Sequence, residues 1–201
     1  EIVGLAGLVG AGRSEIVRAI IGFDKIDSGD VYFPDQKFIA DHPSDAIRAG
    51  IAYLTEDRKN EGLFQEMSVE DNIVVASFSR TMASGFYNKA KAFLLATESR
   101  NKLRIVTPGI HQKVINLSGG NQQKVMLAKW LLTHPDVLIV DEPTHGIDIG
   151  AKYEIYGILK SLAAEGKSIL MISSELPELI GLCDRIVVIK EGKVAGEVGE
   201  G

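Results

Sequence analysis

Cysteine, net positive charge and long apolar runs are all scarce in this sequence, and each scarcity excludes a class of protein. The single cysteine, Cys183, cannot form an internal disulfide, which fits a reducing compartment, and we expect it to be a buried free thiol. No apolar run approaches the roughly 20 residues that a membrane-spanning helix needs. The net charge of −5 argues against a broad nucleic-acid-binding surface.

Short apolar runs and helical patterns alternate along most of the chain, and 45% of its residues are hydrophobic. This alternation predicts an α/β fold with a doubly wound core. We also expect an antiparallel β flap, with strands at 31–33 and 37–40 joined through Pro34 and Asp35, and a hairpin near the end of the chain. The remaining expected elements are strands at 1–6, 51–54, 137–140, 168–172, 185–189 and 194–198, and helices at 15–21, 44–49, 150–164 and 177–182.

Residues 68–106 differ from the rest because they show helical runs and no strand pattern. The runs lie at 68–78, 89–96 and 98–105, and the first begins with a capping-box sequence at Ser68. We therefore predict an α-helical subdomain at 65–115, inserted into a core formed by 1–64 and 116–201. We expect its large apolar side chains to form its own core, namely Met67, Phe78, Met82, Phe86 and Phe93.

A glycine-rich segment, residues 7–14, lies between the first expected strand and the first expected helix. This context suits a phosphate-binding loop, because glycines let backbone N–H groups face an anion and the helix N-terminus adds a favourable dipole. The spacing fits G-x-x-x-x-G-K-[ST], except that Arg13 stands at the lysine position. A dinucleotide-binding fingerprint fits less well because the third small residue is missing, and a plain glycine turn is the other alternative. The candidate phosphate-binding residues are Gly7, Gly10, Ala11, Gly12, Arg13, Ser14 and Glu15.

Two further pieces lie within 117–148. Leu117-Ser118-Gly119-Gly120-Asn121 opens a long helical pattern, and the apolar run 137–140 ends in Asp141 and Glu142. Carboxylates at the C-terminal end of a buried strand lie where open α/β sheets bind their ligands. In P-loop NTPases the loop serine and such an aspartate hold Mg²⁺, and a carboxylate beside the aspartate can act as general base on water. We therefore assign Ser14 and Asp141 to a magnesium ion and Glu142 to catalysis.

In combination these motifs resemble the nucleotide-binding domain of ABC transporters, and the resemblance covers almost the whole chain. Residues 7–14 resemble the Walker A loop, 117–121 resemble the LSGGQ signature with asparagine as its last residue, and 137–142 resemble Walker B with its glutamate. The resemblance implies a P-loop NTPase core, ATP and Mg²⁺ as cofactors, and head-to-tail pairing in which each nucleotide lies between one domain's Walker A loop and the other's signature. It adds these nucleotide-binding residues: Ser118, Gly119, Gly120, Asn121 and, in the D-loop, Asp148.

Three positions depart from the family pattern at points that would touch the γ-phosphate or Mg²⁺. Arg13 replaces lysine, Glu56 takes the place of the Q-loop glutamine that contacts the metal, and Ser174 takes the place of the catalytic switch histidine. Arginine is bulkier and planar, and serine cannot replace histidine in positioning water. The sequence therefore predicts a degenerate nucleotide site that still has Asp141 and Glu142.

The same mixture resembles the C-terminal ATPase half of bacterial ribose/galactose/xylose-type importers, through segments such as YLTEDRKNEGL and DEPTHGIDIGAK. That resemblance implies a second nucleotide-binding domain in the same polypeptide, transmembrane permease subunits, an indirect sugar-binding protein partner, and a peripheral location at the cytoplasmic face of the cell membrane. It implies no nucleic-acid partner. We favour a half that holds ATP with little turnover and supplies LSGGN to the partner site. The alternatives are a fully hydrolytic half and, third, a soluble ABC ATPase outside transport, which the short 68–106 segment disfavours.

Overall fold

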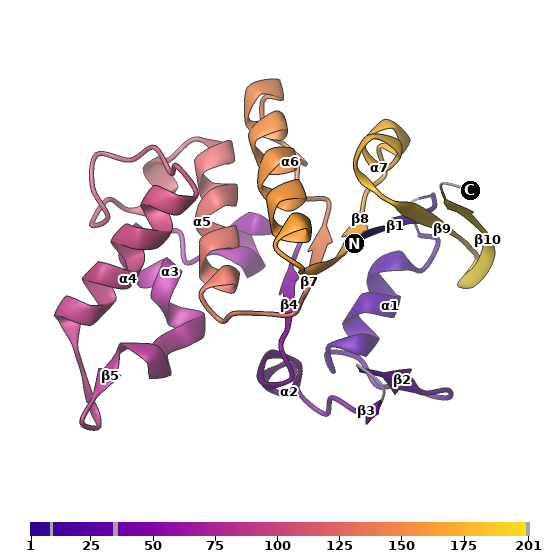
Figure 1. Cartoon of the computed structure of the whole chain (residues 1–201), viewed down its shortest axis with the longest axis horizontal. Coiled ribbons are helices and arrows are strands. Elements are labelled where there is room, and N and C mark those ends of the chain that lie inside the picture. Colours follow the sequence, from indigo (N-terminus) through magenta and orange to yellow (C-terminus); the bar gives the residue numbers. More distant parts are fainter. Residues whose placement is uncertain (9, 34–35, 200–201) are drawn as a thin grey trace. The chain divides into compact units, whose positions relative to one another are not determined.

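The computed structural model describes residues 1–8, 10–33 and 36–199, and Figure 1 shows its elements. Its contacts divide the chain into two compact units, which we describe separately. The first unit contains Glu1–Tyr53, Pro135–Glu142 and Lys160–Gly201, and the second contains Leu54–His134 and Pro143–Leu159. The predicted subdomain at 65–115 falls inside the second unit, and its boundaries stay a prediction. Val9 of the expected phosphate loop and the expected flap joint at 34–35 lie outside the described residues.

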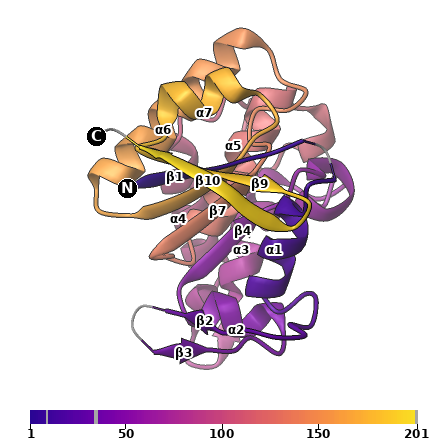
Figure 2. The same ribbon diagram turned by 90° about the vertical axis from the view of Figure 1, so that its right-hand side faces the viewer.

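A six-stranded sheet in the order β10-β9-β1-β8-β7-β4 is the basis of the first unit (Figures 1 and 2). β1 pairs in parallel with β8 and β9, β7 pairs in parallel with β8, and β10 is antiparallel to β9. Because strands far apart in sequence pair in parallel, the α/β prediction is confirmed. The bounds are β1 (Ile2–Ala6), β4 (Ile51–Leu54), β7 (Val137–Asp141), β8 (Ser168–Ile172), β9 (Arg185–Lys190) and β10 (Lys193–Gly199).

The helices of the first unit lie close to their predicted places. They are α1 (Arg13–Ile20), α2 (Pro43–Arg48) and α7 (Leu176–Leu182), and the expected flap is the antiparallel pair β2 (Val31–Tyr32) and β3 (Lys37–Phe38). Apolar side chains from the sheet, α1 and α2 form a buried core; its members are Leu5, Ala11, Val17, Ile21, Ala46, Ile51, Ile139, Ile172 and Ile189. This core fixes the start of α1 against the C-terminal ends of the strands.

Cys183 is a free thiol, as predicted, but it is only partly buried. Its sulfur lies against β1, where a Cβ on Gly4 would approach it to 2.9 Å. Burial raises the pKa of this thiol to about 11, so it stays protonated at neutral pH. The residue therefore belongs to the packing of the sheet.

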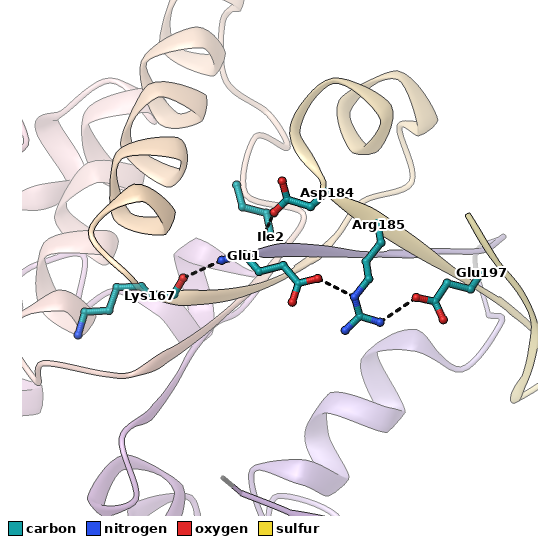
Figure 3. Close-up of polar contacts among 6 residues, drawn as sticks. All are labelled: Glu1, Ile2, Lys167, Asp184, Arg185 and Glu197. Carbon is teal, nitrogen blue, oxygen red and sulfur yellow. Dashed lines mark hydrogen bonds and ion pairs between the residues drawn. The ribbon is translucent and has the colours of Figure 1, made fainter. Parts of the chain in front are cut away.

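An ion-pair network joins strands β1, β9 and β10 at the exposed end of the sheet (Figure 3). The Arg185 guanidinium donates to Glu1 Oε1 at 2.7 Å and to Glu197 Oε1 at 2.8 Å, and the Ile2 N–H donates to Asp184 Oδ2 at 2.7 Å. Because the charged groups are exposed, solvent screens each pair and it contributes little to stability. These contacts hold the ends of the three strands together, and we assign them no binding or catalytic role.

The second unit is mostly helical. Ser68 caps α3 through the predicted capping box with Asp71. No helix among the described residues is long and apolar enough to cross a membrane. The elements are η1 (Arg58–Gly62), α3 (Val69–Val74), η2 (Val75–Thr81), β5 (Met82–Ala83), β6 (Phe86–Tyr87), α4 (Lys89–Lys102), η3 (Val114–Asn116), α5 (Gly119–Leu131) and most of α6 (Ile149–Ala164).

Three predictions for this unit are wrong. Instead of two runs at 89–96 and 98–105 there is one helix, α4, which continues through Thr97 and ends at Lys102. A short antiparallel hairpin, β5–β6, lies where no strand was expected, because two-residue strands are too short to show alternation. The large apolar side chains are not a core: Met82 is half-buried, and Met67, Phe78, Phe86 and Phe93 are 39%, 51%, 79% and 48% exposed. Other apolar residues fill the interior instead, among them Ile73, Met126 and Leu127, together with the fully buried Ala92 and Ala96 of α4.

Candidate functional site

The phosphate-loop candidate of the first unit is shaped by close backbone packing. Gly10 and Gly12 have φ angles of 79° and 100°, in the left-handed region that favours glycine. A Cβ on Gly7 would lie 2.7 Å from the carbonyl oxygen of Ile189, and the Gly192 N–H donates to the Ala11 carbonyl at 2.9 Å. The loop is therefore held on the end of β9 and leads directly into α1. Gly12, the residue that precedes α1, has no side chain with which to cap the helix, so the first N–H groups of α1 suit an anion.

Two hydroxyl groups converge on the buried carboxylate of Asp141 at the end of β7. Ser14 Oγ and Tyr53 Oη each donate to Asp141 Oδ2 at 3.0 Å, and Asp141 is 2% exposed. A serine oxygen beside an aspartate oxygen is a donor set that suits Mg²⁺, which takes oxygen ligands and is usually held by few carboxylates plus phosphates. The predicted pairing of Ser14 with Asp141 is therefore present. Tyr53 was missed; its signal was a hydroxyl-bearing aromatic inside an otherwise apolar strand.

Arg13 and Glu142 are connected through a single peptide group after β8. Arg13 Nη1 donates to the Ser173 carbonyl at 2.9 Å, and the N–H of the next residue, Ser174, donates to Glu142 Oε1 at 2.6 Å. The Ser173 hydroxyl in turn donates to the buried carboxylate of Glu178 at 2.8 Å. Arg13 is 8% exposed, so its guanidinium is an internal group of the site. The arrangement orients the Glu142 carboxylate through the backbone.

Glu142 has an unusual backbone conformation, and its surroundings have opposing effects on the pKa of its carboxyl group. Its φ of 44° is left-handed, which costs a non-glycine residue about 1–2 kcal/mol. Burial raises the pKa of its carboxyl group, while the hydrogen bonds from Ser174 and the charge of Arg13 oppose that rise. A half-buried carboxylate with a raised pKa fits the expected general base better than an ordinary surface glutamate does.

The signature segment lies in the second unit, at the start of α5. Ser118 is the exposed residue before the helix, and Asn121 Nδ2 donates to Ser118 Oγ at 2.9 Å while Asn121 Oδ1 accepts from the Val106 N–H at 2.8 Å. The hydroxyl therefore accepts from Asn121 and can donate its own proton outward. Asparagine at the last signature position thus fixes the serine side chain.

Other segments pack closely on the two signature glycines, most tightly on Gly120. A Cβ on Gly120 would lie 2.4 Å from Ala151 Cβ at the start of α6. A Cβ on Gly119 would lie 3.2 Å from the Gly146 carbonyl and 3.3 Å from Arg58 Nη2. The signature, the D-loop segment and η1 therefore meet inside the second unit.

The remaining candidates of the second unit have structural partners. Asp148 Oδ1 accepts from the Ala151 N–H at 2.9 Å, so this side chain caps α6. Glu56 is exposed, and its Oε1 lies 3.6 Å from His145 Nδ1. Its assignment to the metal stays a prediction. Sequence reasoning also missed Arg58 and Ala151, because their contacts depend on how distant segments pack.

Parallel strands, a glycine-rich loop entering a helix, and a serine–aspartate pair at the strand ends define the P-loop class of nucleotide-binding proteins. Within that class, the family model described as ABC transporter matches residues 1–145. The chain therefore belongs to the ABC transporter family, as its motifs predicted.

Relatives and solved structures agree with this assignment. The chain is 50% identical to a xylose import ATP-binding protein of Thermoanaerobacter pseudethanolicus and 51% identical to a ribose import ATP-binding protein of Burkholderia ambifaria. These matches cover 98% and 99% of the chain but only 39% and 38% of the relatives, so the chain spans about two fifths of their length. An ATP-binding cassette solved with ADP and Pi matches with a TM-score of 0.83 at 23% identity, covering 100% of the chain and 86% of that structure. This likeness shows that the fold is that of an ATP-binding cassette.

Proposed function

We propose that the chain is an ATP-binding cassette of a monosaccharide importer, in which ATP binding and hydrolysis drive uptake. The relatives named for xylose and ribose import support the substrate class. The observation that carries the nucleotide role is the hydrogen bond from Ser14 to Asp141 beneath a glycine-rich loop. The cassette would work at the cytoplasmic face of the membrane, with permease subunits, a sugar-binding protein and a second cassette in the same polypeptide.

When bound, Mg²⁺ would be held by Ser14 and Asp141 together with the nucleotide phosphates, and it would neutralise charge on those phosphates. The loop N–H groups between Gly7 and Glu15 would contact the phosphates themselves. Tyr53 would hold the Asp141 carboxylate in place from β4. Glu142, oriented by the Ser174 N–H, is the group that would accept a proton from water.

This half is proposed to retain ATP with little turnover and to contribute its signature to a competent site in the paired cassette. Arg13 supports the proposal because one of its donors already bonds the Ser173 carbonyl, and Ser174 has no imidazole with which to contact a γ-phosphate. The packing of Gly119 and Gly120 and the fixed Ser118 hydroxyl support a working signature. A fully hydrolytic half is the alternative, favoured by the intact Asp141 and Glu142.

Nucleotide stoichiometry tests the proposal. In the full-length protein, Asp141→Asn should remove one of two magnesium-dependent ATP sites, because its carboxylate would hold the metal. Isothermal titration with ATP and Mg²⁺ would measure this as a halved stoichiometry or as at least about tenfold weaker binding at one site. When EDTA removes Mg²⁺, the variant and the parent should bind ATP with the same affinity and stoichiometry. Unchanged affinity and stoichiometry of Asp141→Asn in Mg²⁺ would contradict the assignment.

A further inference from the structure

Arg58 projects from η1 onto the first turn of α5, where the signature lies. Its Nε donates to Gln122 Oε1 at 3.2 Å, and its Nη1 donates to Gln123 Oε1 at 3.3 Å. Its third nitrogen, Nη2, is the atom 3.3 Å from the point that a Cβ on Gly119 would occupy. All three guanidinium nitrogens therefore face the first turn of the signature helix.

The two glutamine side chains that accept from Arg58 are themselves held in place. Gln122 and Gln123 are 6% and 3% exposed, and Gln122 Nε2 also donates to the carbonyls of Val114 and Leu117, at 3.1 and 3.3 Å. Leu117 immediately precedes Ser118, so the Gln122 amide connects Arg58 to the peptide that leads into the signature.

The turn that carries Arg58 is also anchored. Lys129 Nζ, from α5, donates to the Gly62 carbonyl at 2.5 Å, and Asp57 accepts from the Asn60 N–H at 3.0 Å. A Cβ on Gly62 would lie 2.4 Å from Met126 Sδ, so the turn packs closely on α5. The Arg58 side chain is therefore held at its backbone by the anchored turn and at its guanidinium by the two glutamine amides.

The charge of Arg58 lies where a cation is disfavoured. A helix N-terminus carries partial positive charge, which stabilises anions and destabilises cations nearby. The first turn of α5 has no acidic residue, and the structure gives Arg58 no ion pair with a carboxylate of the described residues. Burial lowers the pKa of its guanidinium, the direction expected for a cation withdrawn from water. The positive end of α5 and the Arg58 guanidinium thus lie together at Gly119, and no carboxylate of the described residues neutralises them. A bound anion would stabilise this arrangement.

We propose that Arg58 is a positioning residue of the signature half-site: it fixes the first turn of α5 and adds its positive charge to the field that this turn presents to the terminal phosphate of a nucleotide held by the paired cassette. The inference rests on the proposed function, because it requires the signature to face a nucleotide. It assigns the charged loop after β4 a direct part in nucleotide recognition. The arginine fork matters because two separate nitrogens, held in one plane, reach the two amides, a geometry that the compact ammonium of a lysine does not reproduce.

The test compares Arg58→Gln, Arg58→Lys and the control Lys59→Gln in the full-length protein. Lys59 is the exposed neighbour on the same turn, so its substitution changes the net charge equally. We expect Arg58→Gln to raise the ATP concentration for half-maximal hydrolysis by about tenfold, the scale of a partly buried charge at a helix end. Arg58→Lys should recover part of this loss, and Lys59→Gln should leave hydrolysis unchanged. Binding of ADP, which has no γ-phosphate, should be the same in all variants.

Three results would overturn the proposal: an unchanged ATP dependence in Arg58→Gln, an equal loss of ADP binding, or the same loss in Lys59→Gln. Equal loss of ADP binding would show that Arg58 only supports folding. The variant Gly120→Ala distinguishes a wrong assignment of Arg58 from a wrong proposed function. If Gly120→Ala abolishes hydrolysis and Arg58→Gln does not weaken it, only the role of Arg58 is wrong. If neither variant affects hydrolysis, the signature half-site itself is not used.

Discussion

The two half-sites of this cassette are built in opposite ways. In the first unit, the polar groups bond one another: Arg13 bonds the Ser173 carbonyl, and Ser14 and Tyr53 share one oxygen of Asp141. In the second unit, the signature is formed by close backbone packing, and a charged group, Arg58, lies beside it without a described counter-ion. The first arrangement satisfies its own charges, whereas the second is arranged for an anion from outside. Substitutions should therefore alter internal bonding in the first half-site and nucleotide-dependent activity in the second.

The largest effect is expected at Gly120. In Gly120→Ala the new methyl group would lie 2.4 Å from Ala151 Cβ, so α5 and α6 must separate. We expect ATP hydrolysis by the full-length protein to fall by at least about 100-fold, as when an oxyanion donor is lost. The unfolding free energy should fall by about 1–3 kcal/mol from overpacking. Steady-state hydrolysis and urea unfolding measure the two effects.

A compensating change sharpens this prediction. Ala151→Gly removes the opposing methyl group, so the double variant Gly120→Ala with Ala151→Gly should regain much of the lost hydrolysis. The matched control is Gly157→Ala in the same α6, where a Cβ meets nothing within 4 Å and should stabilise the helix by about 0.5–1 kcal/mol. Failure of the double variant to recover any activity would indicate that glycine is needed at 120 for another reason.

The stability of the second unit should depend on pH through Lys129, whose Nζ donates to the Gly62 carbonyl in the turn that carries Arg58. Burial lowers the pKa of Lys129 to about 8 from 10.5. Between these two pH values the unfolded chain holds a proton that the folded chain has lost, so stability rises with pH. Relative to Lys129→Met, the parent should gain about 2–3 kcal/mol between pH 7.5 and 11. Urea unfolding across this range measures the gain.

The exposed Lys59 provides the control for this titration. Lys59→Met removes an exposed amine from the turn that Lys129 contacts, so it controls for the loss of one positive charge. A parallel pH dependence of Lys129→Met and the parent would show that Lys129 keeps an ordinary pKa.

The smallest effect is expected at Arg13. Arg13→Met leaves the Ser173 carbonyl without its donor and should lower the unfolding free energy by about 1–3 kcal/mol. Arg13→Lys keeps a donor and should lose less. The control is Arg18→Met on the same α1, where the salt bridge to Asp24 is exposed and screened by solvent, so the loss of stability should be smaller. Equal losses for Arg13→Met and Arg18→Met, measured by urea unfolding, would mean that the Ser173 contact does not contribute.

Much of the first unit could be predicted from sequence because each feature is local. A run such as 137–140 is apolar enough to require burial, and Gly10 and Gly12 mark a loop that turns into a helix. The family pattern then placed Asp141 beside Ser14, which the structure confirms. Tyr53 could not be assigned, because the neighbour of its hydroxyl depends on which strand lies beside β4.

The second unit was predicted less well for a physical reason. Among the charged residues 55–62, sequence reasoning assigned a role only to Glu56, whereas in the structure Arg58 turns inward to the buried amides of Gln122 and Gln123. Those partners are more than 60 residues away, so no local pattern indicates them. The prediction that Phe86 is buried was wrong: its hydrophobicity favoured burial, but other apolar side chains such as Met126 and Ala96 fill the interior of this unit.

Comparison of Glu142→Gln with Gly120→Ala in the full-length protein tests the central claim, that this half's own site is degenerate while its signature serves the paired site. The measurement is steady-state ATP hydrolysis at saturating ATP and Mg²⁺. The account predicts that Glu142→Gln lowers turnover by less than about twofold, while Gly120→Ala lowers it by at least about 100-fold. Loss of hydrolysis in Glu142→Gln as complete as in Gly120→Ala would contradict the account and establish this half as catalytic.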